Sequence, residues 1–451
     1  MHSESESFDV KLVTSLAQLG YLPESARDEP ESANELVGTA ISAFQEFCGL
    51  PITGTMDEQT ENAMNRPRCG NPFGYVGIGL EFVLSGTTWP GARVTFGFDN
   101  FSTDIAQNLQ RQLILNAFAV WEGLMPMRFT EIPIAGNPDI RIQWATATHG
   151  PAAHDAFDGA GNVLAHAFFP PPNGTMAGDV HFDDDEQWTD STTVGTNLFW
   201  VAVHEIGHAL GLDHTSIPNS IMQPFYPCNR GIPNNDDRLG IRTAYRELVW
   251  IDFLYRDILG RAPDIDGLDR FCRSRNGGSS TGNIVDGFLR SAEYCTQTAA
   301  SLYRILLNRE PDAAGLDHWK NILMRGASLQ SVIVGLCDSQ EFKAKFPVPG
   351  RFVEVLYNKL LGRPSDSSGY TGWVNAINAG MSTANVIRGF LTAEEYAVKR
   401  VTEFYRTFLR RAPDQTGSRV HIAAVRRGVA MQEVIRGFVA SDEYRNAVIS
   451  R

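Results

Sequence analysis

Apolar residues recur at helical spacing in the first 66 positions, and turn residues separate the runs. Valine or leucine stands at positions 10, 13, 16 and 19, and this run stops at Gly20. A second run, residues 33–47, ends at Gly49, and a short third helix is expected after Asp57. The pattern predicts a small domain of three helices.

Residues 80–248 mix two periodicities. Apolar stretches of strand length occupy 93–98, 139–144 and 163–169. Longer stretches with helical spacing occupy 105–124, which ends before a proline, and 197–212, which contains none. The mixture predicts an α/β domain.

The last 200 or so residues contain an internal repeat. Four units begin alike, FLYRDILGRAPD, SLYRILLNREPD, VLYNKLLGRPSD and EFYRTFLRRAPD, at about 249–297, 298–346, 350–398 and 399–447. Each unit ends on a segment such as GFLRSAEY or GFVASDEY. One unit could hardly bury its own apolar face, so we expect four stacked all-α units with Tyr255, Tyr303, Tyr357 and Tyr405 in the core.

Length and composition agree with three domains, at 1–74, 75–248 and 249–451. The chain has 451 residues, of which 43% are hydrophobic. No apolar run approaches the roughly 20 residues of a membrane span. The N-terminus, MHSESESFDV, lacks the basic and apolar regions of a signal peptide.

The net charge of −13 is unevenly distributed. Residues 1–248 carry the acidic excess, whereas residues 249–451 carry a basic excess. The acidic half is a poor nucleic-acid binder and a suitable environment for cations. The basic half could meet an anionic surface, although ordinary solvated faces are the simpler interpretation.

The six cysteines stand at positions 48, 69, 228, 272, 295 and 337, and none belongs to a C-x-x-C pair. This spacing argues against a cysteine zinc site and against a full disulfide framework. A bridge between Cys272 and Cys295 is the one pairing that we consider.

The segment VAVHEIGHALGLDH has the spacing of a catalytic zinc site. His204 and His208 lie four residues apart, on one helical face, and Gly211 lets the chain leave the helix so that His214 can return as third ligand. Three protein ligands leave a fourth position open for water, and Glu205 is the expected general base.

H-E-x-x-H-x-x-G-x-x-H followed by Ser220-Ile221-Met222 resembles the metzincin signature. The segment 223–226, Gln-Pro-Phe-Tyr, resembles the wall of the S1′ pocket in matrixins, the matrix metalloproteinase family. The resemblance implies a zinc endopeptidase domain built from a twisted sheet and three helices. It also implies an apolar floor under the zinc and a pocket for an apolar P1′ side chain. The implied substrate-binding residues are Leu164, Ala165, Trp200, Met222, Pro224 and Tyr226.

Three of these residues are informative. Trp200, four residues before His204, is bulkier than usual and predicts a shorter pocket. Leu164 and Ala165 would form the edge strand that pairs with an extended substrate.

Residues 157–168 and 178–188 resemble the structural metal sites of matrixins. The resemblance implies a calcium ion held by Asp158, Gly159, Gly161, Val163, Asp183 and Glu186. A second calcium ion would use Asp139 and Asp179. Oxygen ligands with several carboxylates suit this cation independently of the resemblance.

The resemblance also implies a structural zinc ion at His166 and His181. The family has His-Gly-Asp for the remaining pair, whereas this chain has His149-Gly150-Pro151 and then His154-Asp155. We favour His149 with Asp155 after a two-residue insertion, and His154 is the competing ligand.

Residues 67–72, PRCGNP, resemble the matrixin cysteine switch, and the preceding region resembles the three-helix prodomain, itself like peptidoglycan-binding modules. A Cys69 thiolate would occupy the fourth zinc position and exclude water. Phe73 replaces the aspartate that usually pairs with the switch arginine, which predicts weaker latency. Cleavage between about 74 and 82 would create an ammonium group that pairs with Asp236 or Asp237.

The leading interpretation is a secreted, extracellular bacterial proenzyme, monomeric, acting on proteins or peptides. Its C-terminal units resemble helical repeats of unknown function in bacterial secreted and surface proteins. One alternative is a cell-surface or glycan-binding protein that works through residues 249–451 and carries an incidental protease. Another is a cell-wall hydrolase, suggested by the peptidoglycan-binding likeness of the prodomain.

Overall fold

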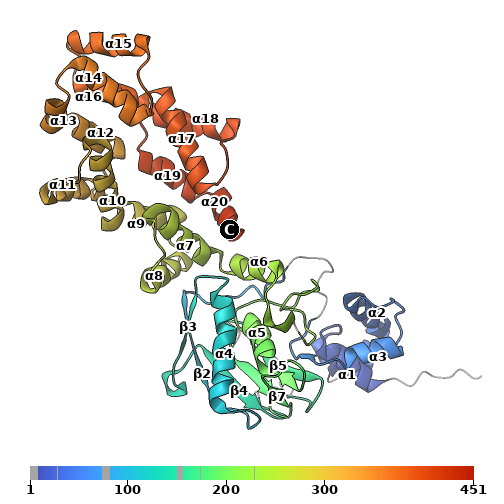
Figure 1. Ribbon diagram of the computed structural model, residues 1–451. Coiled ribbons are helices and arrows are strands. Elements are labelled where there is room, and N and C mark those ends of the chain that lie inside the picture. Colours follow the sequence, from blue (N-terminus) through green and yellow to red (C-terminus); the bar gives the residue numbers. More distant parts are fainter. Residues whose placement is uncertain (1–8, 28, 74–81, 150–155, 173, 228) are drawn as a thin grey trace, which may run out of the picture. The chain divides into compact units, whose positions relative to one another are not determined.

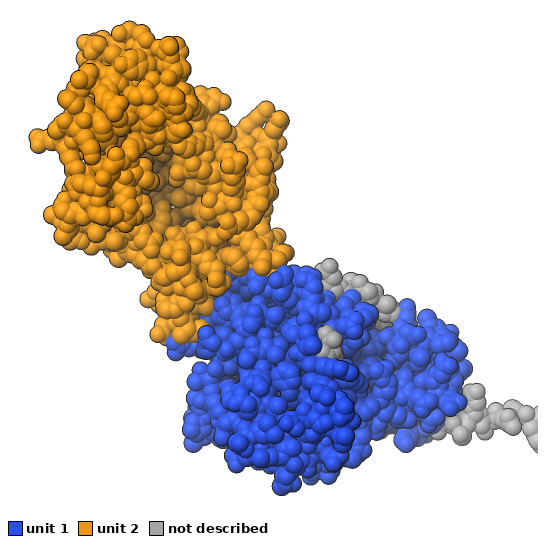
Figure 2. All heavy atoms as spheres, viewed as in Figure 1, with its two compact units in different colours: residues 1–249 blue, residues 250–451 orange. Residues whose placement is uncertain are grey.

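The computed structural model describes residues 9–27, 29–73, 82–149, 156–172, 174–227 and 229–451 (Figure 1). The chain divides into two compact units, residues 1–249 and residues 250–451 (Figure 2). The first unit contains a helical region and a sheet with helices, and the second is helical, so the predicted multidomain fold class is confirmed. In the described part of the chain, every helix is too short or too polar to cross a membrane.

The helical N-terminal region starts and stops where local capping dictates. Asp9 caps the first helix by accepting from Leu12 N, and Asp57 caps the third by accepting from Thr60 N at 2.8 Å. Gly49 ends the second helix with φ 67°. The predicted second helix differs at its start, which is a 3-10 segment. The elements are α1 (Val10–Gln18), η1 (Glu24–Arg27), η2 (Pro30–Leu36), α2 (Val37–Cys48) and α3 (Glu58–Met64).

A six-stranded sheet follows, in the order β1-β5-β6-β4-β2-β3. All neighbours are parallel except β5 and β6, and β1, from the switch segment, pairs with β5 at the sheet edge. The strands are β1 (Arg68–Cys69), β2 (Arg93–Phe98), β3 (Arg128–Glu131), β4 (Ile140–Ala145), β5 (Val163–Ala167) and β6 (Val180–Asp183); β7 (Trp188–Thr189) and β8 (Thr196–Asn197) form a separate pair.

Two helices, α4 (Gln107–Glu122) and α5 (Leu198–Ala209), pack against each other and contact the sheet (Figure 1). Trp121 joins them, because its fully buried indole N–H donates to Val203 O at 3.0 Å. A third helix, α6 (Asn235–Ala244), begins with a capping box between Asn234 and Asp237. The short elements η3 (Ile134–Gly136) and η5 (Asn229–Gly231) complete the unit.

The second unit consists of short helices joined by tight turns. They are α7 (Arg246–Leu259, which begins at the end of the first unit), α8 (Ile265–Asn276), α9 (Thr281–Leu289), α10 (Ala292–Leu302), η6 (Tyr303–Leu307), α11 (Ala313–Met324), α12 (Leu329–Cys337), α13 (Gln340–Lys345), α14 (Pro349–Leu356), η7 (Tyr357–Leu361), α15 (Ser367–Asn378), α16 (Thr383–Thr392), α17 (Glu394–Phe408), α18 (Gln415–Arg426), α19 (Met431–Val439) and α20 (Asp442–Ile449). The segments η6 and η7 are single π-helical turns.

Each repeat contains the same clamp. Its arginine forms a two-bond ion pair with a glutamate 32 residues later, as Arg309 does with Glu341, and the guanidinium lies 4.9–5.0 Å from the ring centre of the repeat tyrosine. The four tyrosines are 3–5% exposed, which confirms that they belong to the core. Because each hydroxyl lies against a helical glycine, a side chain at that glycine would collide with it.

The fourth repeat contacts the first and the second repeat. The repeats therefore close on one another and do not form an open stack. Helix α19 contacts both α9 and α12. Gln330 and Gln432 exchange bonds across the α12–α19 contact: each amide donates to a carbonyl and accepts from a backbone N–H of the other segment, at 2.7–3.0 Å. Trp250 Nε1 donates to Val439 O at 2.7 Å.

None of the five described cysteines forms a disulfide, and the bridge considered between Cys272 and Cys295 is therefore absent. The two residues lie on separate helices, α8 and α10, and both are buried.

The glycine under the repeat tyrosine gives a test of the clamp. We expect Gly369→Ala to destabilise the second unit by about 1–3 kcal/mol, because the new methyl group would overlap the Tyr357 hydroxyl. Gly372→Ala, in the same helix with open space around it, should stabilise by up to about 1 kcal/mol. Urea unfolding followed by circular dichroism measures both. Equal effects of the two substitutions would contradict the close contact between Gly369 and the Tyr357 hydroxyl.

Candidate active site

Helix α5 carries two fully buried histidines whose ring orientation is set by backbone carbonyls. His204 Nδ1 lies 2.7 Å from Ile221 O, and His208 Nδ1 lies 2.8 Å from Leu212 O. Because a carbonyl can only accept, each Nδ1 carries the proton and each Nε2 presents a lone pair. Burial lowers the pKa of His204 to about 4, and burial with the neighbouring His204 lowers that of His208 well below its usual value, which keeps both rings neutral.

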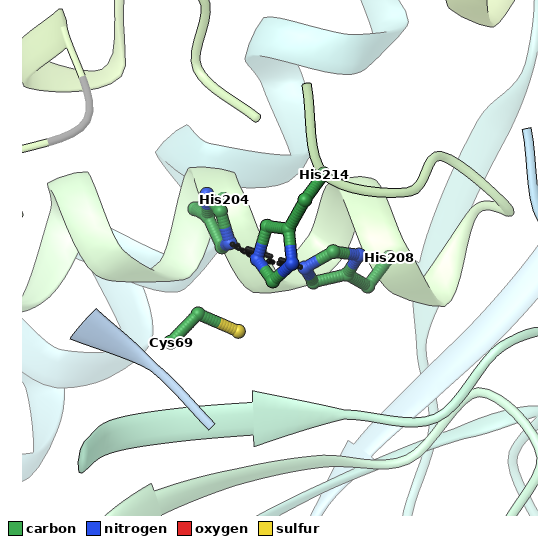
Figure 3. Close-up of side chains that lie close together, drawn as sticks. All are labelled: Cys69, His204, His208 and His214. Carbon is green, nitrogen blue, oxygen red and sulfur yellow. Dashed lines mark hydrogen bonds between the residues drawn. The ribbon is translucent and has the colours of Figure 1, made fainter. Parts of the chain in front are cut away.

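The third histidine reaches the same point after a sharp turn. Gly211 has φ 96°, and a side chain there would collide with the carbonyl of Thr87. His214 then lies with its Nε2 3.2 Å from that of His204 and 3.1 Å from that of His208 (Figure 3). At least two of these facing nitrogens lack a proton, so the arrangement repels itself unless a cation lies between them. Three neutral imidazoles fit Zn²⁺.

Cys69 completes this group. Its Sγ and the ligand nitrogens of the three histidines all lie within 4.8 Å of one another, and Figure 3 shows the thiol directed toward the rings. Cys69 Sγ also lies 3.5 Å from Glu205 Oε2. Glu205 is 1% exposed, its Oε1 has no hydrogen-bond partner, and burial raises its pKa to about 8 against the opposing bond from Cys69. The spacing therefore brings together all the side chains predicted for the catalytic centre.

The turn that contains Met222 packs against helix α5, which carries His204 and His208. Met222 is 2% exposed and lies so close to Gly207 that a side chain there would collide with its sulfur. The buried Asp237 carboxylate holds the turn, because it accepts from the Ser220 hydroxyl at 2.5 Å and from Ile221 N at 3.0 Å. Asp236 instead accepts from Phe82 N at 2.7 Å, so of the two candidate partners for a new N-terminus it is the one near that segment.

The switch segment occupies the groove between β5 and the 224–226 wall. On one side Gly70 N donates to Ala165 O at 2.7 Å, and on the other side Cys69 N donates to Pro224 O at 2.9 Å. Tyr226 N donates to Pro67 O at 2.9 Å. Leu164 and Ala165, in the neighbouring strand β5, are buried. These are backbone groups with which an extended peptide could pair.

Asn71 is a site residue that the sequence analysis missed. Its side-chain amide brackets the backbone of Ala167, donating to the carbonyl at 2.7 Å and accepting from the N–H at 3.1 Å. Its place in the PRCGNP segment was the available signal, but the pairing itself depends on β5 lying alongside.

The predicted pocket side chains lie together. The rings of Trp200 and Tyr226 are 5.9 Å apart, and Trp200 is 8% exposed. Tyr226 OH accepts from Asn197 N at 3.0 Å, which ties the wall to the first turn of α5. The Arg230 guanidinium lies 5.7 Å from the Trp200 ring centre, on the surface of the domain.

A second histidine cluster contains His149, His166 and His181. His166 Nε2 lies 3.3 Å from His149 Nε2 and 3.1 Å from His181 Nδ1. Burial, with the charge of His149, lowers the pKa of His181 to about 4, so this ring is neutral and suited to a metal ion. The other candidate ligands, His154 and Asp155, lie outside the described residues.

The carboxylates predicted for the first calcium ion surround a short glycine loop. Asp183 is fully buried, and its Oδ2 has no hydrogen-bond partner. Glu186 Oε1 accepts from Gly161 N at 2.5 Å, and Asp158 Oδ1 accepts from Val163 N at 3.2 Å. Burial and the neighbouring negative charges raise the pKa of Asp183 to about 6 and also raise that of Glu186. Gly159 and Gly161 adopt φ 80° and 131°. A calcium ion would relieve this charge cluster.

The two carboxylates predicted for the second calcium ion already accept hydrogen bonds from other residues of the sheet. Asp139 Oδ2 accepts from the backbone and the hydroxyl of Thr95, both at 2.7 Å, and Asp179 Oδ1 accepts from Arg141 N at 3.0 Å. Burial raises the pKa of Asp179 to about 7. Among the described residues, only the two histidine clusters bring three ligand-type side chains within 4.8 Å of one another.

Comparisons with known proteins agree with this geometry. Residues 88–246 match the matrixin family, and residues 10–64 match a putative peptidoglycan binding domain. Residues 243–298, 296–346 and 348–400 match a domain of unknown function, DUF4214.

Three relatives illustrate the similarity. Human matrix metalloproteinase-15 is 39% identical over 263 residues, covering 53% of this chain and 39% of the relative. The hatching enzyme of Paracentrotus lividus is 40% identical over 235 residues, covering 51% and 37%. The macrophage metalloelastase of Oryctolagus cuniculus is 40% identical over 208 residues, covering 46% and 43%. The match spans less than half the length of each relative.

The central region is therefore a matrixin domain, a metalloendopeptidase domain of the metzincin type. It follows a domain of the peptidoglycan-binding family and precedes repeats of unknown function. The recognised family is confirmed, and zinc and calcium are the metals of matrixins.

Metal analysis tests the two histidine clusters separately. We expect the full-length protein to hold about two zinc equivalents, and His204→Ala or His166→Ala each to remove about one. Mass spectrometry of metal content after dialysis measures this. His149→Ala should also remove one equivalent. If His154→Ala does so and His149→Ala does not, the competing ligand assignment is correct.

Proposed function

We propose that this chain is a latent zinc-dependent endopeptidase in which Cys69 inhibits the catalytic zinc ion. The observation that carries the proposal is the position of Cys69, beside three buried histidines and within the groove that a substrate would need. A thiolate is a strong zinc ligand, and at this position it excludes water.

Zinc held by His204, His208 and His214 would supply Lewis-acid chemistry, polarising the scissile carbonyl and acidifying water. Glu205 then acts as general base, taking a proton from the attacking water and passing it to the leaving amine. Its burial supports this role, because the raised pKa brings the carboxyl close to neutral pH.

The substrate is a protein or peptide in extended conformation. It takes the place of residues 67–71 and pairs with β5 and the 224–226 wall, whose backbone groups now bind the switch segment. The Trp200–Tyr226 contact limits the depth of the S1′ pocket, so the enzyme prefers a short apolar P1′ side chain.

We further propose that the enzyme is secreted and monomeric, and that structural zinc and calcium ions stabilise it extracellularly. The calcium ligands are those of the Asp158–Val163 loop with Asp183 and Glu186, and a second ion uses Asp139 and Asp179. The structural zinc ion uses His149, His166 and His181 with Asp155.

Substitution of the base tests the reaction. We expect Glu205→Ala to lower casein cleavage by about 10²–10⁴-fold without loss of zinc, because the proton transfer is removed and the ligands remain. Glu131→Ala, an exposed glutamate of the same domain, should leave cleavage unchanged. The active protein should also lose about 8 kDa, roughly 75 residues.

Two outcomes would favour other functions. Failure to cleave proteins after a thiol reagent displaces Cys69 would leave a binding protein that works through its repeats. Release of muropeptides in place of casein fragments would indicate a cell-wall hydrolase.

Pocket depth gives an independent test of substrate choice. We expect Trp200→Leu to raise kcat/KM about tenfold for peptides with a long aryl P1′ group, because the smaller side chain deepens the pocket. Cleavage of matched P1′ leucine peptides should change little and serves as the control. Efficient cleavage of the long-aryl peptides by the unsubstituted enzyme would exclude a role for Trp200.

A further inference from the structure

We propose that Phe73 locks the inhibitory segment in place through an aromatic cluster shared by the helical domain and the catalytic domain. The proposal rests on the latent protease function and identifies what holds Cys69 at the zinc site. It reverses the expectation, drawn from the missing aspartate, that latency is weak.

Phe73 is 1% exposed and contacts aromatic rings from both domains. From the helical domain, Tyr21 and Phe47 approach with ring centres at 5.8 and 5.2 Å. From the catalytic domain, Phe225 and His214 approach at 5.5 and 5.6 Å, His214 with its ring nearly perpendicular, at 89°. Edge-to-face geometry at these distances is attractive for aromatic pairs. One side chain therefore contacts the inhibitory domain, the groove wall and a zinc-ligand histidine.

The cluster is continuous with the core of the helical domain. Phe73 N donates to Leu19 O at 3.0 Å, and Tyr21 packs edge-on against Phe44 at 5.6 Å. Phe225, although it belongs to the catalytic domain, is buried within the same hydrophobic cluster as the prodomain helices. The core of the helical domain therefore extends through Phe73 to the wall residue Phe225.

The guanidinium of Arg66 adds a contact at the margin of this cluster, 4.4 Å from the ring centre of Phe225. The prodomain thus covers the outer face of a wall residue whose neighbours, Pro224 and Tyr226, pair with the switch segment.

An aspartate at position 73 would be disfavoured in this environment. A carboxylate among four aromatic rings loses its hydration, which is unfavourable unless a cation compensates. Arg68, the switch arginine, is 7% exposed and lines the same small cavity as Asp158, whose charge opposes the lowering of the Arg68 pKa by burial. The arginine thus has a negative neighbour in the catalytic domain and does not require one at position 73.

The lock constrains the thiol mechanically. Hydrogen bonds of β1 hold Cys69 on its N-terminal side, and Phe73, four residues later, anchors its C-terminal side. Gly70 and Asn71 also bond to β5 on this side, and Phe73 adds the apolar anchor, so loss of the Phe73 contacts should release Cys69 more often. Because apolar burial is not screened by ions, latency should persist at high salt, whereas an ion-pair lock would weaken.

The test measures how fast Cys69 becomes accessible. Full-length protein is treated with an alkylating reagent for short times, and peptide mapping quantifies Cys69 labelling before any loss of mass. We expect Phe73→Ala to raise the labelling rate at least about tenfold, the equivalent of 1.4 kcal/mol of lost packing. The matched control is Phe44→Leu, which weakens the same helical core but not the described contacts with the catalytic domain.

Two results would overturn the lock. One is a labelling rate in Phe73→Ala no higher than in Phe44→Leu. The other is slower labelling in Phe73→Asp than in the unsubstituted protein, with a loss of that protection at about 1 M salt, because this would show that an ion pair is the better lock.

Peptide cleavage measured on the same samples separates this proposal from the proposed function. Faster labelling in Phe73→Ala without proteolysis would support the lock and contradict the protease. Proteolysis that appears on thiol modification, with labelling unaffected by Phe73→Ala, would support the protease and contradict the lock.

Discussion

Three neutral imidazoles, buried and facing one point, are the constraint on which the first unit depends. Two of the rings are turned by fixed backbone partners, and the facing lone pairs repel one another when no cation is present. Ile221 and Leu212 supply carbonyls for two of the rings. The turn at Gly211 and the Met222 turn, itself held by Asp237, exist to deliver these partners.

Residues 67–70 pair with the backbone groups that we propose bind the substrate. The switch segment pairs with β5 and with the wall at Pro224, so the groove is filled along its length as well as at the metal position. In the proposed zymogen, latency would therefore depend on the whole strand and on the contacts of Phe73 as well as on the thiol. In that proposal, the ring contacts of Phe73 hold the segment in a chain that lacks the usual aspartate.

Much of the fold followed from local rules. Helix boundaries near Gly20, Gly49 and Asp57 were predicted because capping and left-handed glycines act within a few residues. The 3-10 start before α2 was not predicted, because its apolar spacing is the same as that of an α-helix. The closure of the fourth repeat on the first and second was also missed, because the Gln330–Gln432 exchange joins residues about 100 positions apart.

By itself the sequence placed His204, Glu205 and His208 together, because residues four apart on a helix share a face. His214 followed from the turn expected at Gly211, and Cys69 followed only from the resemblance of PRCGNP to the matrixin cysteine switch. Only the tertiary structure decided what Phe73 and Asn71 do. Their partners come from β5, from the wall and from the prodomain helices, and proximity between such segments arises from packing, which no local spacing encodes.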